Sequence, residues 1–118
     1  MFEMRFDDGD RILCLKYTGT VTPAVYEAHM PEVEEAFARL RPSRLLFDWT
    51  GIEAWAPETE SHRLHARIGH RSDFERVAIV GAAKWQEEAR KVDEIMECEV
   101  RFYEPDEEPE AWEWLKGD

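Results

Sequence analysis

The sequence predicts an α/β fold, in which a mixed β-sheet of about five strands has about four helices packed against it. The run Val77–Val80 is apolar without polar alternation, which is typical of a strand covered on both faces. Asp8-Gly9 lies between two strand-like segments and indicates a leading hairpin. Helix-like and strand-like segments then alternate along the chain, as in βαβ units with right-handed crossovers.

The first half of the chain contains the hairpin and one long helix. Phe2–Phe6 alternates apolar and polar residues, which predicts a half-exposed strand, and Arg11–Thr18 supplies its partner. Thr22 as N-cap and Pro23 as first helical residue then begin a helix. Because Pro31 has no N–H, we expect a kink or a break there. The apolar stripe of this helix comprises Tyr26, Met30, Val33, Phe37 and Leu40.

The middle of the chain contains a buried strand and a second helix. Leu45–Phe47 predicts a short strand that ends at Asp48. We interpret Trp49–Ala56 as a loop. Pro57 then begins a weakly amphipathic helix that ends near Gly69, and the strand Val77–Val80 follows.

The C-terminal third predicts two further helices around a fifth strand. A helix follows Gly81, and Glu99–Tyr103 alternates as the fifth strand does. Asp106 is the expected cap of the last helix, which carries Trp112 and Leu115 inward. The inward face of the preceding helix comprises Trp85, Ala89, Val92 and Met96.

Length and charge limit the classes of function. A chain of 118 residues predicts a single domain over residues 1–118. The net charge of −12 disfavours nucleic acid as a partner, because a phosphate backbone would be repelled. The stretch His62–Lys91 has seven Lys or Arg against four Asp or Glu, so it carries +3 and the remainder −15. This stretch is either a set of solvated helix faces or a basic face for an anionic group or acidic partner.

Other sequence features bear on location and redox state. No apolar run approaches the roughly 20 residues that a transmembrane helix needs. The first residues lack the basic region and apolar block of a signal peptide, so we expect a cytoplasmic protein. Cys14 and Cys98 do not form a CxxC pair, and we expect both to be buried, reduced thiols.

Several motifs resemble one known family. The block His70–Gly81, followed by Lys84-Trp85, is the most specific, and Leu45–Asp48, Trp55 and Pro31–Glu35 agree with it, as does Tyr26. The chain resembles the SpoIIAA-like proteins of the STAS-like superfamily, whose fold is similar to that of the lipid-binding CRAL-TRIO (Sec14-like) domain. The resemblance covers nearly the whole chain and implies a STAS-like fold. It implies little about chemistry, because most members are uncharacterised.

One position departs from the superfamily pattern. STAS proteins that act as anti-sigma factor antagonists carry a phosphorylatable Ser at the start of the helix after the third strand. By spacing from Asp48, that position falls at Ala56-Pro57, and Thr59 and Ser61 are out of register. The resemblance therefore does not imply control by Ser phosphorylation here.

Six residues follow the ends of the predicted strands and form a candidate ligand-binding rim. Open α/β sheets bind ligands at the carboxyl ends of their strands. Aromatic rings with one cation and one carboxylate suit an amphipathic ligand with an anionic head. Alternatively, the tryptophans cap the core and Lys84 is merely solvated. The rim residues are Asp48, Trp49, Trp55, Lys84, Trp85 and Tyr103.

A second set of residues predicts a polar or basic face. His62 and His65 share a helix face with Glu58, but they do not have the spacing of a known zinc site, so we expect no metal and no cofactor. His70 and Asp73 could form an acid–base pair, although a helix C-terminus and a turn explain both residues structurally. The face comprises His62, His65, His70, Arg71 and Asp73.

These features favour a non-enzymatic binding or regulatory module for a protein partner or a small amphipathic or anionic ligand. A homodimer and peripheral membrane contact are both compatible with this function. The alternative is lipid-type ligand carriage at a membrane surface, which needs an acyl-chain pocket between the sheet and the second and third helices. The least favoured hypothesis is an enzyme that uses His70 with Asp73 or Asp48.

Overall fold

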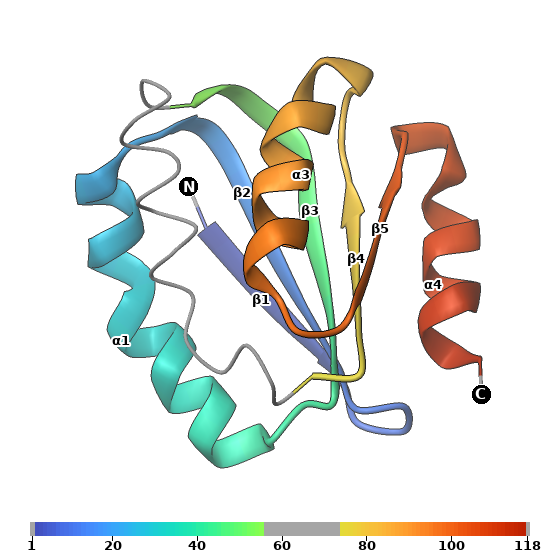
Figure 1. The fold of residues 1–118 in the computed structure, drawn as a ribbon. Coiled ribbons are helices and arrows are strands. Elements are labelled where there is room, and N and C mark those ends of the chain that lie inside the picture. Colours follow the sequence, from blue (N-terminus) through green and yellow to red (C-terminus); the bar gives the residue numbers. More distant parts are fainter. Residues whose placement is uncertain (1, 56–73, 118) are drawn as a thin grey trace.

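A computed structural model of the chain describes residues 2–55 and 74–117. These residues form one five-stranded sheet in the order β1-β2-β3-β4-β5 (Figure 1). β1 pairs with β2 antiparallel, and all other neighbours are parallel. The predicted mixed sheet with a leading hairpin is therefore confirmed. The strands are β1 (Phe2–Asp7), β2 (Ile12–Val21), β3 (Arg44–Trp55), β4 (Arg76–Val80) and β5 (Glu99–Tyr103).

Both faces of the sheet carry helices. The described residues contain three α-helices, not about four: α1 (Pro23–Leu40), α3 (Gln86–Ile95) and α4 (Glu108–Lys116). The other helix expected, from Pro57 to Gly69, lies outside the described residues. α1 and α3 pack on one face, and α4 packs on the other. Two 3₁₀ turns, η1 (Ala83–Trp85) and η2 (Pro105–Glu107), precede α3 and α4.

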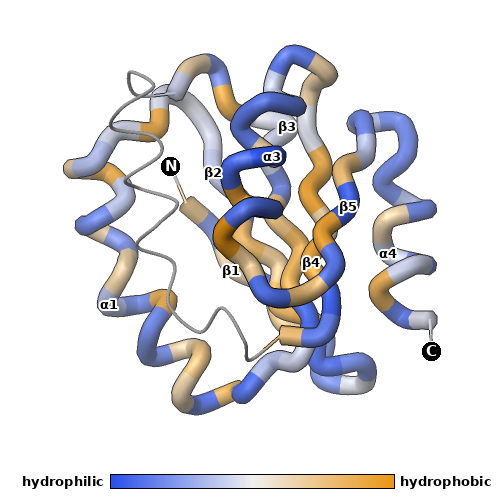
Figure 2. Tube along the Cα trace, viewed as in Figure 1, coloured by the Kyte–Doolittle hydropathy of each residue, from blue (hydrophilic) through white to orange (hydrophobic). Residues whose placement is uncertain are grey.

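The strands contribute alternately to two apolar cores. Leu45 and Phe47 of β3 face α1 and α3, whereas Leu46 between them faces α4. In β4 the four residues Val77–Val80 are each 0% exposed. The expectation that both faces of this strand are covered is thus confirmed, and Figure 2 shows hydrophobic residues gathered along the central strands.

Local side-chain hydrogen bonds define the hairpin and the start of α1. Asp7 Oδ1 accepts hydrogen bonds from the backbone N–H groups of Gly9 at 3.0 Å and Asp10 at 3.3 Å. Thr22 Oγ1 accepts from the Val25 N–H at 3.2 Å, with Pro23 next in the chain. The predicted turn and the predicted helix N-cap are both confirmed.

Of the kink or break predicted at Pro31, the break is wrong, because α1 runs unbroken from Pro23 to Leu40 (Figure 1). A proline in a helix removes one backbone hydrogen bond. Tyr26 and Val33, on either side of the proline, are both buried against the sheet. Tertiary packing of this face therefore holds the two halves in one helix.

The predicted end of β3 at Asp48 is also wrong, because the strand continues through Trp55. Its second half pairs with the second half of β2, where Thr18 lies opposite Gly51 and Val21 opposite Trp55. Two register shifts each give β3 one more residue than β2. Such bulges interrupt the alternation by which a strand is recognised, so the segment resembled a loop.

The last helix is fixed at both ends. Glu104 and Glu107 form a capping box at the start of η2, the turn that leads into α4, and in it the Glu104 N–H donates to Glu107 Oε1 at 2.8 Å. Asp106 lies inside this turn and is not the cap. Leu115 is fully buried as predicted, whereas Trp112 is only partly buried.

Two arginines at the beginning of neighbouring strands hold the last turn of α4. Arg44 Nη1 donates to the carbonyls of Leu115 and Gly117, and Arg76 Nη1 donates to Trp114 O at 2.5 Å. The last carbonyls of a helix lack the regular backbone partner one turn ahead, and cations are favoured beside them. The Gly117 N–H also donates to Trp114 O, at 3.3 Å. The pair therefore anchors α4 to β3 and β4.

Candidate functional site

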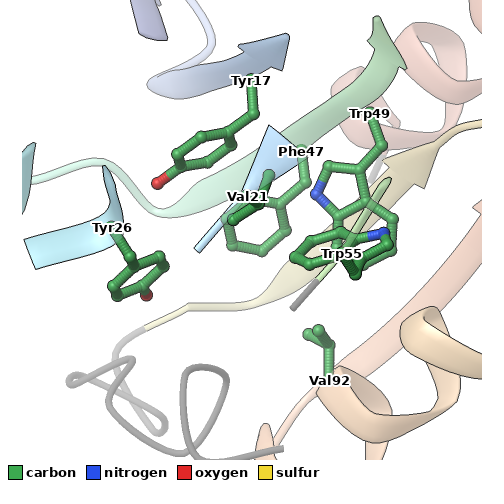
Figure 3. Close-up of a pocket in the computed structure, with 7 residues that line it drawn as sticks. All are labelled: Tyr17, Val21, Tyr26, Phe47, Trp49, Trp55 and Val92. Carbon is green, nitrogen blue, oxygen red and sulfur yellow. The ribbon is translucent and has the colours of Figure 1, made fainter. Parts of the chain in front are cut away.

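An apolar cavity lies between the sheet and the two helices α1 and α3, at the carboxyl ends of β2 and β3. Its volume is about 20 Å³, which is close to the space that one water molecule needs. The side chains that surround it come from β2, β3, α1 and α3 (Figure 3). They are Tyr17, Val21, Tyr26, Phe47, Trp49, Trp55 and Val92.

The bulges of β3 bring two of these tryptophans together. Six residues of regular strand span about 20 Å, so Trp49 and Trp55 would be far apart on a straight β3. Their ring centroids are instead 4.8 Å apart with an interplanar angle of 73°, an edge-to-face contact. Figure 3 shows the two indoles side by side at one end of the cavity.

Trp85 and Lys84 of η1 extend this aromatic group towards solvent. The ring centroids of Trp55 and Trp85 are 6.4 Å apart at 82°. Lys84 is exposed, and its Nζ lies 4.9 Å from the centroid of the Trp85 ring, a cation–π distance. The Trp85 Nε1 atom is buried, and none of the described residues accepts its hydrogen bond.

Gly81 makes the approach of β4 to these rings possible. A Cβ atom at this position would lie 3.1 Å from the Trp49 Cβ and 3.7 Å from the Trp85 Cδ1. Its N–H donates to Tyr103 O at 3.0 Å, which fixes the end of β4 against β5. We call Trp49, Trp55, Lys84 and Trp85 the aromatic site.

The sheet separates the other two predicted rim residues from the aromatic site. Asp48 and Trp49 are consecutive in β3, so their side chains point to opposite faces. Tyr103 packs with the core under α4, where its ring centroid is 6.5 Å from that of Trp114. The prediction that six residues line one rim is therefore corrected to four on one face and two on the other.

Asp48 instead belongs to a polar concavity on the face that carries α4. The carboxylate is only 6% exposed, and its Oδ1 accepts from Thr50 N at 3.0 Å and Thr50 Oγ1 at 2.6 Å. The concavity has a volume of about 250 Å³. It is lined by three strands through Glu3, Arg5, Cys14, Lys16 and Asp48.

Sequence reasoning missed this concavity, although the alternation of β1 and β2 places its residues on one face. The pKa of the Cys14 thiol is raised to about 11, mainly by burial and next by the Asp48 carboxylate, and Arg5 opposes both effects. Cys14 is thus a buried, free thiol as expected. Cys98 is also free but only partly buried.

The expected polar or basic face lies outside the described residues. This holds for His62, His65, His70, Arg71 and Asp73. Within residues 2–55 and 74–117, no three His, Cys, Asp or Glu side chains converge as metal ligands do. No helix in the same residues has the length and apolar character to cross a membrane.

Comparisons with known proteins agree with this architecture. The family model described as SpoIIAA-like matches residues 12–116. A solved structure of an uncharacterised DUF3478-family protein from Shewanella loihica PV-4, with a SpoIIAA-like fold, superimposes with a TM-score of 0.72. The two chains are 26% identical, and the match covers 98% of this chain and 92% of that chain. No curated protein matches the sequence. The family match, over nearly the whole chain, shows that this protein belongs to the SpoIIAA-like family.

Proposed function

We propose that this protein is a non-enzymatic binding module that takes a small amphipathic ligand with an anionic head at the aromatic site. One observation carries the proposal. The Trp85 N–H is buried without an acceptor among the described residues, and the Lys84 ammonium lies 4.9 Å from the centroid of the same indole. This indole contacts Trp55, which lines the apolar cavity. The site thus offers a donor, a cation and an apolar space at one place.

The donor and the cation together suit a carboxylate. A buried N–H without a partner costs about 1–3 kcal/mol, and an acceptor on the ligand would recover that cost. A hydrogen bond to a charged oxygen is about twice as strong as a neutral one. Lys84 supplies the opposite charge close to the same position in a chain that is otherwise strongly acidic.

The volume of the cavity limits the size of the apolar group that the ligand can bury there. A volume of about 20 Å³ receives about one methyl or methylene group and not an acyl chain. Each buried methylene contributes about 0.8 kcal/mol, roughly a fourfold gain in affinity. Affinity should therefore gain from about one buried carbon and then level off as the alkyl chain lengthens.

Titration of the protein with linear carboxylates from butanoate to hexadecanoate, followed by tryptophan fluorescence, tests this function. We expect saturable binding with a plateau at short chain length. An affinity that keeps rising about fourfold per carbon through hexadecanoate would favour lipid carriage instead. Absence of saturable binding along the whole series would remove the proposal.

Two variants localise the binding to the aromatic site. Trp85→Phe keeps an aromatic ring but removes the N–H, and Lys84→Gln removes the cation. We expect each variant to weaken butanoate binding by about tenfold or more. Lys84→Gln should leave 1-butanol binding nearly unchanged, whereas Trp85→Phe should weaken it less than it weakens butanoate binding, because the alcohol oxygen is a neutral acceptor. Trp112→Phe is the matched control, because that indole donates to Glu108 Oε2 at 3.4 Å on α4. Equal effects of Trp85→Phe and Trp112→Phe would place binding elsewhere.

A further inference from the structure

β1 is an edge strand with a regular register. Among the described strands, its one hydrogen-bonded neighbour is β2 (Figure 1). The register runs from Phe2 opposite Tyr17 to Asp7 opposite Ile12 without a shift, and the strand has no proline. Edge strands usually carry a bulge, a proline or a cover that prevents pairing with another chain. β1 contains neither a bulge nor a proline that would block pairing along its outer edge.

The side chains of β1 form two distinct rows. Phe2, Met4 and Phe6 are half-buried and pack on the core beneath α1 and α3. Glu3 and Arg5 are exposed on the other face, and no ion pair within 4.0 Å joins either to another described residue.

At the opposite edge of the sheet, the charged side chains of the edge strand are paired. Its strand β5 also carries an acid and a base two residues apart, Glu99 and Arg101. These two are already paired, with Nε and Oε2 at 2.7 Å, and Arg101 also lies 4.5 Å over the Trp114 ring. The charges of β5 are therefore paired with each other. On β1, Glu3 lies opposite Lys16 of β2 and Arg5 interacts with the Cys14 thiol, but both side chains are exposed and neither has an ion pair within 4.0 Å among the described residues.

We propose that a second copy of this chain pairs antiparallel with β1 about Met4, so that one sheet runs through a homodimer. In this register Glu3 lies opposite Arg5 of the second copy, and Arg5 lies opposite Glu3 of the second copy. Met4 lies opposite Met4 of the second copy, and each Phe2 lies opposite a Phe6. Opposite charges and aromatic side chains across an antiparallel pair both stabilise it.

The pattern of β1 identifies the partner as an identical strand. Read from Met4 in either direction, the order is a charged residue and then a phenylalanine, and the two charges have opposite sign. Such a segment complements itself under a two-fold rotation, which is the symmetry of most protein dimers. The rotation axis is perpendicular to the sheet, so the half-buried rows of both copies continue on the same face.

Charge reversal tests the register, with sedimentation velocity over a range of protein concentrations as the measurement. We expect the wild-type chain to form a concentration-dependent dimer. Glu3→Arg and Arg5→Glu each place like charges opposite each other at both ends of the pair, so each should weaken the dimer by at least about tenfold. The double swap Glu3→Arg/Arg5→Glu restores complementarity and should restore the dimer, which also controls for the fold.

Cross-linking gives a second and independent test. In a Cys98→Ser background, Met4→Cys should form an intermolecular disulfide on mild oxidation, because opposed Cα atoms in an antiparallel pair lie about 4.5–5.5 Å apart. Glu3→Cys should not, because it would lie opposite Arg5 of the second copy. A wild-type monomer at every concentration overturns the proposal. So does a dimer that both charge reversals leave intact, or one that cross-links equally through both cysteines.

Discussion

Burial makes Cys14 a poor nucleophile, although this residue is one of those that line the polar concavity. The pKa of the thiol is raised to about 11, first by burial and then by Asp48. A raised pKa means less thiolate at any lower pH, so only about 0.1% of the thiol is ionised at pH 8. We expect Cys14 to react with iodoacetamide at least about 100-fold more slowly than an unperturbed cysteine at pH 8. Its rate should rise about tenfold per pH unit up to pH 10.

Cys98 provides the internal control for this measurement. Its pKa is also raised, by burial and then by Asp93, but its side chain is only partly buried. Mass spectrometry of peptides from the alkylated, folded protein should therefore show carboxamidomethyl groups first at Cys98. Equal modification of both residues at pH 8 would contradict the burial of Cys14.

The separation of Asp48 from the aromatic site is also decided by the position of a single residue in a strand. Asp48 and Trp49 were both placed at the end of the predicted third strand, and the ends of parallel strands suggested a shared site. Within a strand, neighbours point to opposite faces, so this pair had to separate once the strand continued past Asp48. The placement of Trp49 and Trp85 near neighbouring strand ends was predictable, whereas the ring contact of Trp49 with Trp55 was not, because it depends on bulges.

At the scale of elements, the bulged part of β3 depends on a glycine. A Cβ atom at Gly51 would lie 2.5 Å from Thr18 Cγ2 and 3.3 Å from Thr18 Cβ, directly across the strand pair. Gly51→Ala should therefore lower the free energy of unfolding by about 1–3 kcal/mol, as overpacking does. Urea denaturation of the variant and the wild type measures the difference.

A second substitution checks that this contact is the cause. Thr18→Ser removes the Cγ2 methyl group that a side chain at residue 51 would meet. In the Thr18→Ser background, Gly51→Ala should cost distinctly less than it does alone, and the coupling of the two sites follows from a double-mutant cycle. The same cost in both backgrounds would show that backbone conformation, not the methyl contact, requires the glycine.

Elements with regular patterns were predictable, and irregular ones were not. β5 was predicted with its observed limits, Glu99–Tyr103, and the Thr22 cap of α1 was also predicted, because alternation and capping are local. The end of β3 and the continuity of α1 through Pro31 depend on pairing and packing with distant segments. Such tertiary effects override local signals and are not visible in a short window of sequence.

At the scale of the whole molecule, the two cores share one set of strands. β4 contributes Val77 and Ile79 to the core beneath α1 and α3, and Ala78 and Val80 to the core beneath α4. Loss of β4 would expose both cores at once. The cation–π and hydrogen-bond contacts of Arg76 with Trp114 further join α4 to the first residue of this strand. The described residues should therefore behave as one cooperative unit.

The positions of the tryptophans allow a direct test of this cooperativity. Trp49, Trp55 and Trp85 lie on the face of α1 and α3, whereas Trp112 and Trp114 belong to α4. Protein labelled with 5-fluorotryptophan and followed by ¹⁹F NMR during urea denaturation reports on both faces in one sample. We expect the native resonances of all five indoles to disappear with the same midpoint, as a two-state transition requires. If the Trp112 and Trp114 resonances disappear at lower urea than the other three, α4 unfolds first and the two cores are separate cooperative units.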